Sequence, residues 1–130
     1  MSPPRPTILI VDDEPHMLRL VAFALKSVEA SLVTASSGLD AVKIIRARPV
    51  QLALFDVHMK DIDGLTALRE LRADPDHKNI TVILITGAGD TQVEEQGRAL
   101  GVQAFFRKPF SPAQLAARVR ELLALSPPAA

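Results

Sequence analysis

Five polar side chains, three of them carboxylates, follow apolar runs of strand length in this 130-residue chain. They are Asp12, Asp13, Asp56, Thr86 and Lys108. Clustered carboxylates repel one another, and each would raise the pKa of the others unless a cation neutralised them. A hard divalent ion such as Mg²⁺ binds one or two carboxylates together with water and phosphate oxygens. These residue types therefore indicate a site for Mg²⁺ and a phosphoryl group, provided that the fold brings them together.

Asp56 ends the most informative of these runs. Residues 52–64 read LALFDVHMKDIDG, so four apolar residues precede this acid and a loop ending in Asp-Gly follows it. A carboxylate can act as the nucleophile in phosphoryl transfer and form an aspartyl phosphate. Such a transfer needs mainly positioning and charge neutralisation, which Lys108 and the hydroxyl of Thr86 can supply together with a metal. Asp56 is therefore the first candidate for a reacting group.

Five segments have the composition of β-strands, and helical patterns separate them. The predicted strands are residues 7–11, 31–35, 52–56, 80–85 and 102–106. The predicted helices cover residues 17–28, a segment from 38 that closes at 46–49, and residues 65–71, 91–100 and 112–123. Apolar strands that alternate with helices are typical of a parallel sheet covered on both faces. The sequence therefore predicts a flavodoxin-like α/β fold with five parallel strands in the order 2-1-3-4-5.

In such a sheet the carboxyl ends of the strands border one crevice, so the five polar residues should converge. Each of them has an ordinary explanation when it is taken alone. An aspartate after a strand often caps a helix, and a lysine usually lies on the surface. The coincidence of all five at strand ends favours a common site.

Composition limits the class of function. The chain is 48% hydrophobic, which supports one globular domain, and it has no apolar run as long as a membrane span. Fifteen basic and fifteen acidic residues cancel, and aromatic residues make up 4%, unlike a nucleic-acid-binding domain. The absence of cysteine excludes disulfides and thiolate chemistry. Because the chain opens on polar and proline-rich residues instead of a signal peptide, we expect a cytoplasmic domain that binds neither membranes nor nucleic acid.

Both ends of the chain lie outside the predicted strands and helices. We expect residues 1–6 to form a disordered N-terminal segment and residues 7–125 to form the domain. Residues 126–130 are rich in proline and alanine. They are expected to be a tail or the start of a linker.

The helix predicted at residues 91–100 has few apolar residues to hold it. Val93 and Leu100 are its strong apolar anchors. Glu94, Glu95 and Gly97 lie between them, and a glycine in a helix interior costs about 1 kcal/mol relative to alanine. We therefore expect this helix to be able to move.

Four motifs resemble the receiver domain of two-component response regulators, over about residues 7–125. They are LIVDDEP at 9–15, ALFDVHM at 53–59 with the Asp-Gly that follows, ILITG at 83–87 and AFFRKPF at 104–110. Each motif is weak by itself, whereas the set in this order and spacing is highly specific. The resemblance implies that Asp56 accepts a phosphoryl group from a phosphohistidine on a histidine kinase or a histidine phosphotransfer protein.

The resemblance also assigns roles around Asp56. Asp12 and Asp13 would hold Mg²⁺, together with Asp56 and the backbone carbonyl of His58. Thr86 and Lys108 would bind the phosphoryl oxygens.

Phe105 matches the aromatic residue that switches together with Thr86 in this family. The resemblance implies that the switch acts on the helix at 91–100, the last strand and the last helix, used for homodimerisation or for binding an effector. The bond between Lys108 and Pro109 is commonly cis in the family. The chain would thus be a signalling switch that assists its own phosphorylation and dephosphorylation, not an enzyme.

His16, Leu20 and Phe23 form a stripe off the main apolar face of the first predicted helix. Scattered apolar side chains are common on protein surfaces, so partial burial is one explanation. The other is a docking surface for the kinase, because the start of this helix borders the crevice. The sequence leaves both interpretations open.

Two other functions use the same residue types. A metal-dependent phosphatase of the haloacid-dehalogenase type also forms an aspartyl phosphate, but its two acids lie two residues apart after the first strand. Here Asp12 and Asp13 are adjacent, and Asp56 follows the third strand. A receiver-like adaptor that is never phosphorylated would not need all five polar groups.

Overall fold

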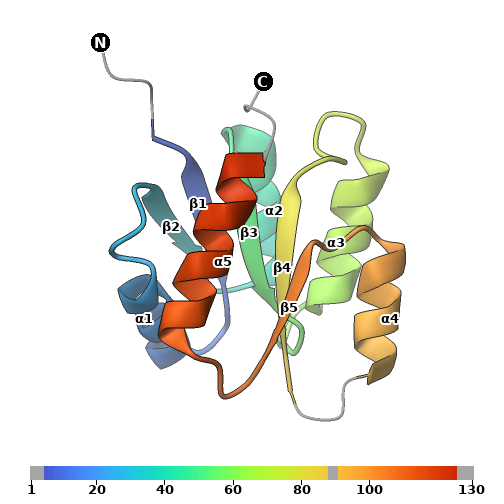
Figure 1. The fold of residues 1–130 in the computed structure, drawn as a ribbon. Coiled ribbons are helices and arrows are strands. Elements are labelled where there is room, and N and C mark those ends of the chain that lie inside the picture. Colours follow the sequence, from blue (N-terminus) through green and yellow to red (C-terminus); the bar gives the residue numbers. More distant parts are fainter. Residues whose placement is uncertain (1–4, 88–90, 126–130) are drawn as a thin grey trace.

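The computed structural model describes residues 5–87 and 91–125, in which strands and helices alternate along the chain (Figure 1). The strands are β1 (Thr7–Val11), β2 (Ser31–Ala35), β3 (Leu52–Asp56), β4 (Thr81–Thr86) and β5 (Ala104–Arg107). The helices are α1 (Pro15–Ala24), α2 (Gly38–Ala47), α3 (Gly64–Ala73), α4 (Thr91–Ala99) and α5 (Pro112–Leu125). Every strand pair is parallel, and the order is β2-β1-β3-β4-β5. The predicted flavodoxin-like topology is confirmed.

Helices cover both faces of the sheet, α1 and α5 on one side and α2, α3 and α4 on the other (Figure 1). Alternate strand residues enter separate clusters because successive side chains of a strand point to opposite faces. Leu54 of β3 joins the cluster beneath α1 and α5, while its neighbour Phe55 joins the cluster beneath the other helices. The central strands β1, β3 and β4 are buried along their whole length. This rigid double-sided core fixes the strand ends that carry the polar residues.

The first helix is shorter than its apolar spacing predicts, so the predicted end at residue 28 is wrong. The structure ends α1 at Ala24, and Leu25 is its C-cap. Turn hydrogen bonds then follow, including one from the N–H of Val28 to the carbonyl of Leu25 at 2.9 Å. Leu25 and Val28 are nevertheless buried. The turn keeps the same side chains facing the core, which is why the spacing alone did not reveal it.

Two strands begin later than predicted, β4 by one residue and β5 by two. The N–H of Val102 donates to the carbonyl of Gly97 at 3.0 Å, so Val102 closes the end of α4 instead of starting a strand. Gly101 has a φ of +80°, which glycine adopts without strain and which suits the turn after a helix. Gly101 therefore lies in the turn that follows α4.

The bond between Lys108 and Pro109 is cis, as the resemblance implied. At the start of α5, Ser111 Oγ accepts from the N–H of Gln114 at 3.2 Å, as an N-cap side chain does. Within residues 5–87 and 91–125, no helix is long and apolar enough to span a membrane. Of the two predicted end segments, residues 1–4 and 126–130 lie outside the described part of the chain.

Candidate functional site

Three carboxylates meet at the carboxyl edge of the sheet. Asp12 and Asp13 follow β1, and Asp56 is the last residue of β3. Each offers a carboxylate oxygen, and these three oxygens lie within 4.8 Å of one another. β1 and β3 pair in register with Val11 opposite Phe55, so the acids that come next are neighbours. An oxygen-only set of this size fits a hard divalent cation.

Asp12 is an acid of this cluster whose pKa is raised. Only 2% of its surface is exposed, and the loss of solvation on burial is the main cause that raises its pKa from 3.8 to about 6. The nearby charge of Asp56 raises the pKa further. A hydrogen bond from the N–H of Glu14 and the charge of Lys108 act in the opposite direction. A bound cation would favour the ionised carboxylate and lower this pKa.

Lys108 brings a positive charge to the same place. Its Nζ lies 3.2 Å from Asp56 Oδ2 and 3.9 Å from Asp12 Oδ2. The lysine side chain is 31% exposed, whereas the two carboxylates are almost completely buried. The ammonium group therefore reaches from the rim of the site toward buried acids.

Thr86 completes the set at the end of β4. Its hydroxyl oxygen is buried and, within the described part of the chain, has no hydrogen-bond partner. A buried hydroxyl without a partner is costly, so it is a group that a ligand oxygen would stabilise. The N–H of Lys108 donates to the carbonyl of Thr86 at 2.9 Å, which ties the two residues together through their backbones.

The five polar residues singled out in the sequence thus end at one edge of the sheet. Asp12, Asp13, Asp56 and Lys108 are in direct proximity, and Thr86 is linked to Lys108 by a backbone hydrogen bond. The N–H of His58 donates to Asp56 Oδ1 at 3.3 Å. The role of the His58 carbonyl as a metal ligand stays a prediction.

Phe105, the predicted switch residue, is partly buried and packs with the cluster beneath α2, α3 and α4. A Cβ atom placed on Gly97 would lie 2.9 Å from Phe105 Cε1 and 2.8 Å from Leu84 Cδ1. The missing side chain of Gly97 therefore allows the ring to pack closely against α4. The guanidinium of Arg98 lies 5.3 Å from the centre of the same ring.

Polar contacts that the sequence patterns did not reveal hold α4. Glu94 is buried, and its Oε2 accepts from Arg107 Nε of β5 at 2.9 Å. Arg72 of α3 donates to four backbone carbonyls, those of Lys78, Ile80, Leu100 and Gly101. Burial lowers the pKa of this guanidinium. The partners lie between 6 and 29 residues apart in the chain, at no regular spacing. The sequence therefore shows charged residues that could pair, but not which partners they have.

The hydrogen bonds of Asp61 were also not predicted from the sequence. Its carboxylate accepts from the N–H groups of Gly38 at 3.1 Å and Leu39 at 2.9 Å. Loss of solvation, the largest single effect, raises the pKa of Asp61, but hydrogen bonds from several N–H groups together lower it. Backbone donors have no residue signature, so spacing could not reveal this contact.

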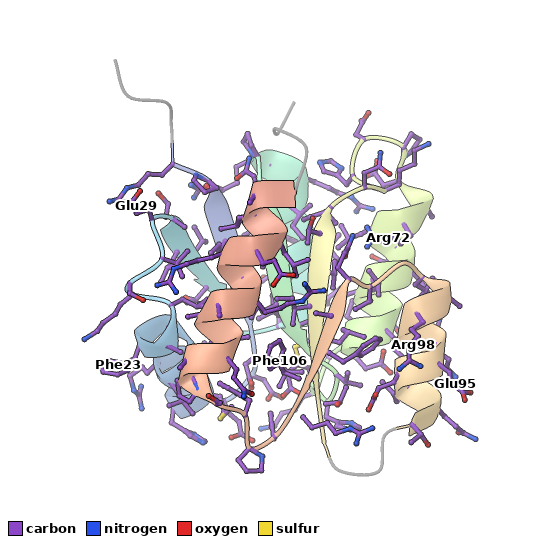
Figure 2. All side chains as sticks on the ribbon, in the orientation of Figure 1. Phe23, Glu29, Arg72, Glu95, Arg98 and Phe106 are labelled. Carbon is purple, nitrogen blue, oxygen red and sulfur yellow. The ribbon has the colours of Figure 1, made fainter. Side chains whose placement is uncertain are left out.

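The two apolar side chains of the stripe on α1 are exposed. Leu20 is 44% exposed and Phe23 is 64% exposed. Figure 2 shows Phe23 projecting from α1 away from the sheet. Lys26 Nζ lies 4.2 Å from the centre of the Phe23 ring.

Comparison with known proteins gives the family. The family described as "Response regulator receiver domain" matches residues 8–120. The chain belongs to this receiver domain family, as the four motifs indicated. The adjacent acids after β1 and the single acid at the end of β3 also follow the receiver arrangement and not that of the phosphatases.

Relatives of known sequence are longer than this chain. The probable transcriptional regulator ycf27 of Cyanophora paradoxa is 37% identical over 116 residues, which cover 89% of this chain and 47% of that protein. The cyclic di-GMP phosphodiesterase response regulator RpfG of Xanthomonas campestris pv. campestris is 36% identical over 120 residues, 91% of this chain and 32% of RpfG. The chain thus spans half the length of these relatives or less.

Solved structures agree on the fold. The signal receiver domain of a signal transduction histidine kinase from Syntrophus aciditrophicus is 29% identical, with a TM-score of 0.83. The match covers 92% of this chain and 90% of that one. The signal receiver domain of an HD domain-containing protein from Pseudomonas fluorescens is 25% identical, with a TM-score of 0.86. That match covers 96% of this chain and 91% of the other.

Proposed function

We propose that this receiver domain accepts a phosphoryl group on Asp56 from a phosphohistidine of a histidine kinase or a histidine phosphotransfer protein. The placement of Asp56 carries this proposal. Asp56 is the last residue of β3, and its Oδ2 lies 3.2 Å from Lys108 Nζ. Its carboxylate also belongs to the cluster of three acids. Family membership supports the same assignment.

In the proposed step, a carboxylate oxygen of Asp56 attacks the phosphorus atom. The new O–P bond forms as the N–P bond of the phosphohistidine breaks, and the imidazole keeps the electron pair and takes up a proton. The attacking carboxylate loses no proton, so the domain needs no general base for this step. Its contribution is positioning and charge neutralisation, the usual means of catalysing phosphoryl transfer.

Lys108 and Thr86 act on the transferred group. The ammonium of Lys108 already faces the Asp56 carboxylate, so it can neutralise a phosphoryl oxygen there. The buried hydroxyl of Thr86 can donate a hydrogen bond to another phosphoryl oxygen. Both contacts would stabilise the phosphorylated domain.

The acidic cluster is the proposed magnesium site. Asp12, Asp13, Asp56 and the backbone carbonyl of His58 would hold Mg²⁺, which when bound supplies positive charge for the phosphoryl oxygens. Burial and, to a smaller extent, the charge of Asp56 raise the pKa of Asp12, and this supports a cation at this place.

The proposed output passes through α4, β5 and α5. A hydrogen bond from the Thr86 hydroxyl to the phosphoryl group would draw Thr86 toward Asp56 and let Phe105 turn inward. Because that ring packs on Gly97 of α4, its movement would shift the balance between two arrangements of α4. The altered surface would serve homodimerisation or an effector.

The exposed stripe of Leu20 and Phe23 on α1 is the proposed docking surface for the phosphodonor. Its helix begins three residues after Asp12, so a partner bound there would be close to the acidic cluster. Aromatic side chains are common anchors of protein interfaces.

Labelling with radiolabelled acetyl phosphate tests the proposed function. The domain should incorporate label only with Mg²⁺, and hydroxylamine should release it because acyl phosphates are cleaved by that reagent. Label that resists hydroxylamine would argue against an aspartyl phosphate, and label that forms equally well in EDTA would argue against the magnesium site.

A further inference from the structure

A carboxylate from the loop after β3 satisfies the first amides of α2. Asp61 Oδ1 accepts from the N–H of Gly38 at 3.1 Å, and Oδ2 accepts from the N–H of Leu39 at 2.9 Å. The next two amides, of Asp40 and Ala41, donate to the Oγ and the carbonyl of Ser37. The bond from Ala41 is the first hydrogen bond of the helix itself. The amides of Gly38, Leu39 and Asp40, which have no partner within the helix, are therefore all satisfied, two of them by a residue distant in the chain.

A close steric contact lies beside these hydrogen bonds. A Cβ atom on Gly38 would lie 2.6 Å from Ile62 Cγ1 and 2.9 Å from the carbonyl oxygen of Ile62. Ile62 packs against the cluster beneath α2 and α3. Glycine at position 38 thus lets the loop lie directly on the start of α2. Asp61 and Ile62 hold the loop there by two different kinds of contact.

The same loop contacts the acidic cluster. The N–H of Lys60, the residue before Asp61, donates to Asp13 Oδ2 at 3.1 Å. The N–H of His58 donates to Asp56 Oδ1 at 3.3 Å. Two carboxylates of the proposed metal site are therefore oriented by backbone groups of this loop. Whatever fixes the middle of the loop also fixes those two contacts.

We propose that Asp61 is a positioning residue for the divalent-cation site. By anchoring the loop on α2, it keeps the amides of Lys60 and His58 beside Asp13 and Asp56. This inference rests on the proposed function, in which these carboxylates bind Mg²⁺. Groups that orient metal ligands typically change metal affinity by about 10- to 100-fold when they are removed.

Magnesium binding to the unphosphorylated domain tests this role. The chain has no tryptophan or tyrosine, so isothermal titration calorimetry is a suitable method. Asp61→Ala is expected to raise the Kd for Mg²⁺ about tenfold. Amide exchange at Lys60 should also become faster in the metal-free protein, because its contact with Asp13 loosens. This second readout does not depend on metal or on phosphorylation.

Ser37→Ala is the matched control. It removes a cap from the same end of α2 but leaves the bonds between Asp61 and the helix. Its Kd for Mg²⁺ should stay within about twofold of wild type, since the loop remains anchored. If Ser37→Ala weakens Mg²⁺ binding as much as Asp61→Ala does, the effect comes from general destabilisation and the inference is wrong.

Two further variants keep the test decisive if Asp61→Ala folds poorly. Asp61→Asn retains one acceptor oxygen, so its affinity should fall between those of wild type and Asp61→Ala. Gly38→Ala keeps the carboxylate but pushes Ile62 away, so it should also weaken Mg²⁺ binding. Unchanged affinity in both variants would overturn the role of Asp61. If wild type itself does not bind Mg²⁺ or accept phosphate, the proposed function fails instead.

Discussion

Arg107 Nε lies 2.9 Å from Glu94 Oε2, so an ion pair joins β5 to α4 one residue before Lys108. The glutamate side chain is 9% exposed, and the arginine side chain is 58% exposed. The hydrogen bond to Glu94 raises the pKa of Arg107. Figure 2 shows Arg98 and Glu95 on the same helix, and Arg98 approaches the other oxygen of Glu94 at 4.0 Å. A helix with few apolar anchors is thus held by charge.

Loss of this pair should loosen α4. Glu94→Gln is expected to speed amide exchange in α4 about tenfold, because a charge-assisted hydrogen bond is lost from a buried site. Hydrogen exchange followed by mass spectrometry or NMR measures this. Glu95→Gln, at the exposed neighbouring position, is the control and should leave exchange unchanged. Equal protection of α4 in Glu94→Gln and wild type would show that the pair does not hold the helix.

Gly97→Ala should report on the contact between α4 and Phe105. Alanine improves helix propensity by about 1 kcal/mol, but its Cβ would overlap Leu84 and the Phe105 ring. Overpacking typically costs about 1–3 kcal/mol, so we expect a net loss of about 1 kcal/mol in urea unfolding.

The double variant Gly97→Ala/Phe105→Leu separates the two effects. Leucine lacks the ring atoms next to Gly97, so adding alanine to Phe105→Leu should cost less than adding it to wild type. If the alanine costs the same in both backgrounds, the ring does not occupy the space that Gly97 leaves.

The raised pKa of the buried acid Asp12 predicts that the stability of the metal-free domain depends on pH. The pKa of Asp12 in the folded domain, about 6, is higher than its ordinary 3.8, so the folded state binds more protons between these values. The contribution of Asp12 to stability is therefore present at low pH and is lost as pH rises through about 6. The difference corresponds to at most about 3 kcal/mol. Urea unfolding without metal at pH 4.5 and pH 7.5 measures it.

Asp12→Asn is the variant that isolates this effect. Without Mg²⁺ it should be more stable than wild type at pH 7.5, and the advantage should shrink at pH 4.5. With Mg²⁺ the advantage should also shrink, because only wild type gains from binding the cation. An asparagine variant less stable than wild type at pH 7.5 without metal would contradict the electrostatic account.

The sequence predicted the buried strands well and the end of the first helix poorly. Apolar runs that end in Asp56 and Thr86 defined buried strands and their polar ends, because burial on both faces leaves a continuous pattern. The end of α1 was missed because Leu25 and Val28 stay in the core after the helix has stopped. Side-chain spacing reports burial, and hydrogen bonds of the backbone decide where a helix ends.

The sequence predicted the residues of the site, but not the contacts that hold the neighbouring helix and loop in place. The four charged groups that meet at the sheet edge were found because each follows a strand. Glu94 was counted among the residues that leave the helix at 91–100 weakly anchored, since its partner Arg107 comes from a strand later in the chain. Asp61 binds backbone amides of α2, which carry no residue signature. Such contacts are set by tertiary structure and have no local signal in the sequence.

The exposed stripe on α1 gives a prediction about the phosphodonor. Phe23→Asp should slow phosphoryl transfer from a cognate histidine kinase by about tenfold or more, as expected for loss of an aromatic anchor. Labelling by acetyl phosphate should be unchanged, because that small donor needs no docking surface. Leu39→Gln is the control, because it makes an exposed apolar residue of α2 polar without adding a charge beside Asp61. Equal transfer rates for Phe23→Asp and Leu39→Gln would exclude the stripe as the docking surface.

The proposal that Asp56 is the phosphoacceptor is central, and intact-mass spectrometry after incubation with acetyl phosphate and Mg²⁺ tests it most directly. Wild type is expected to gain the mass of one phosphoryl group. Asp56→Asn, which keeps the shape of the side chain but removes the nucleophilic carboxylate, is expected to gain none. An unchanged mass in wild type, or the same gain in Asp56→Asn, would contradict the account.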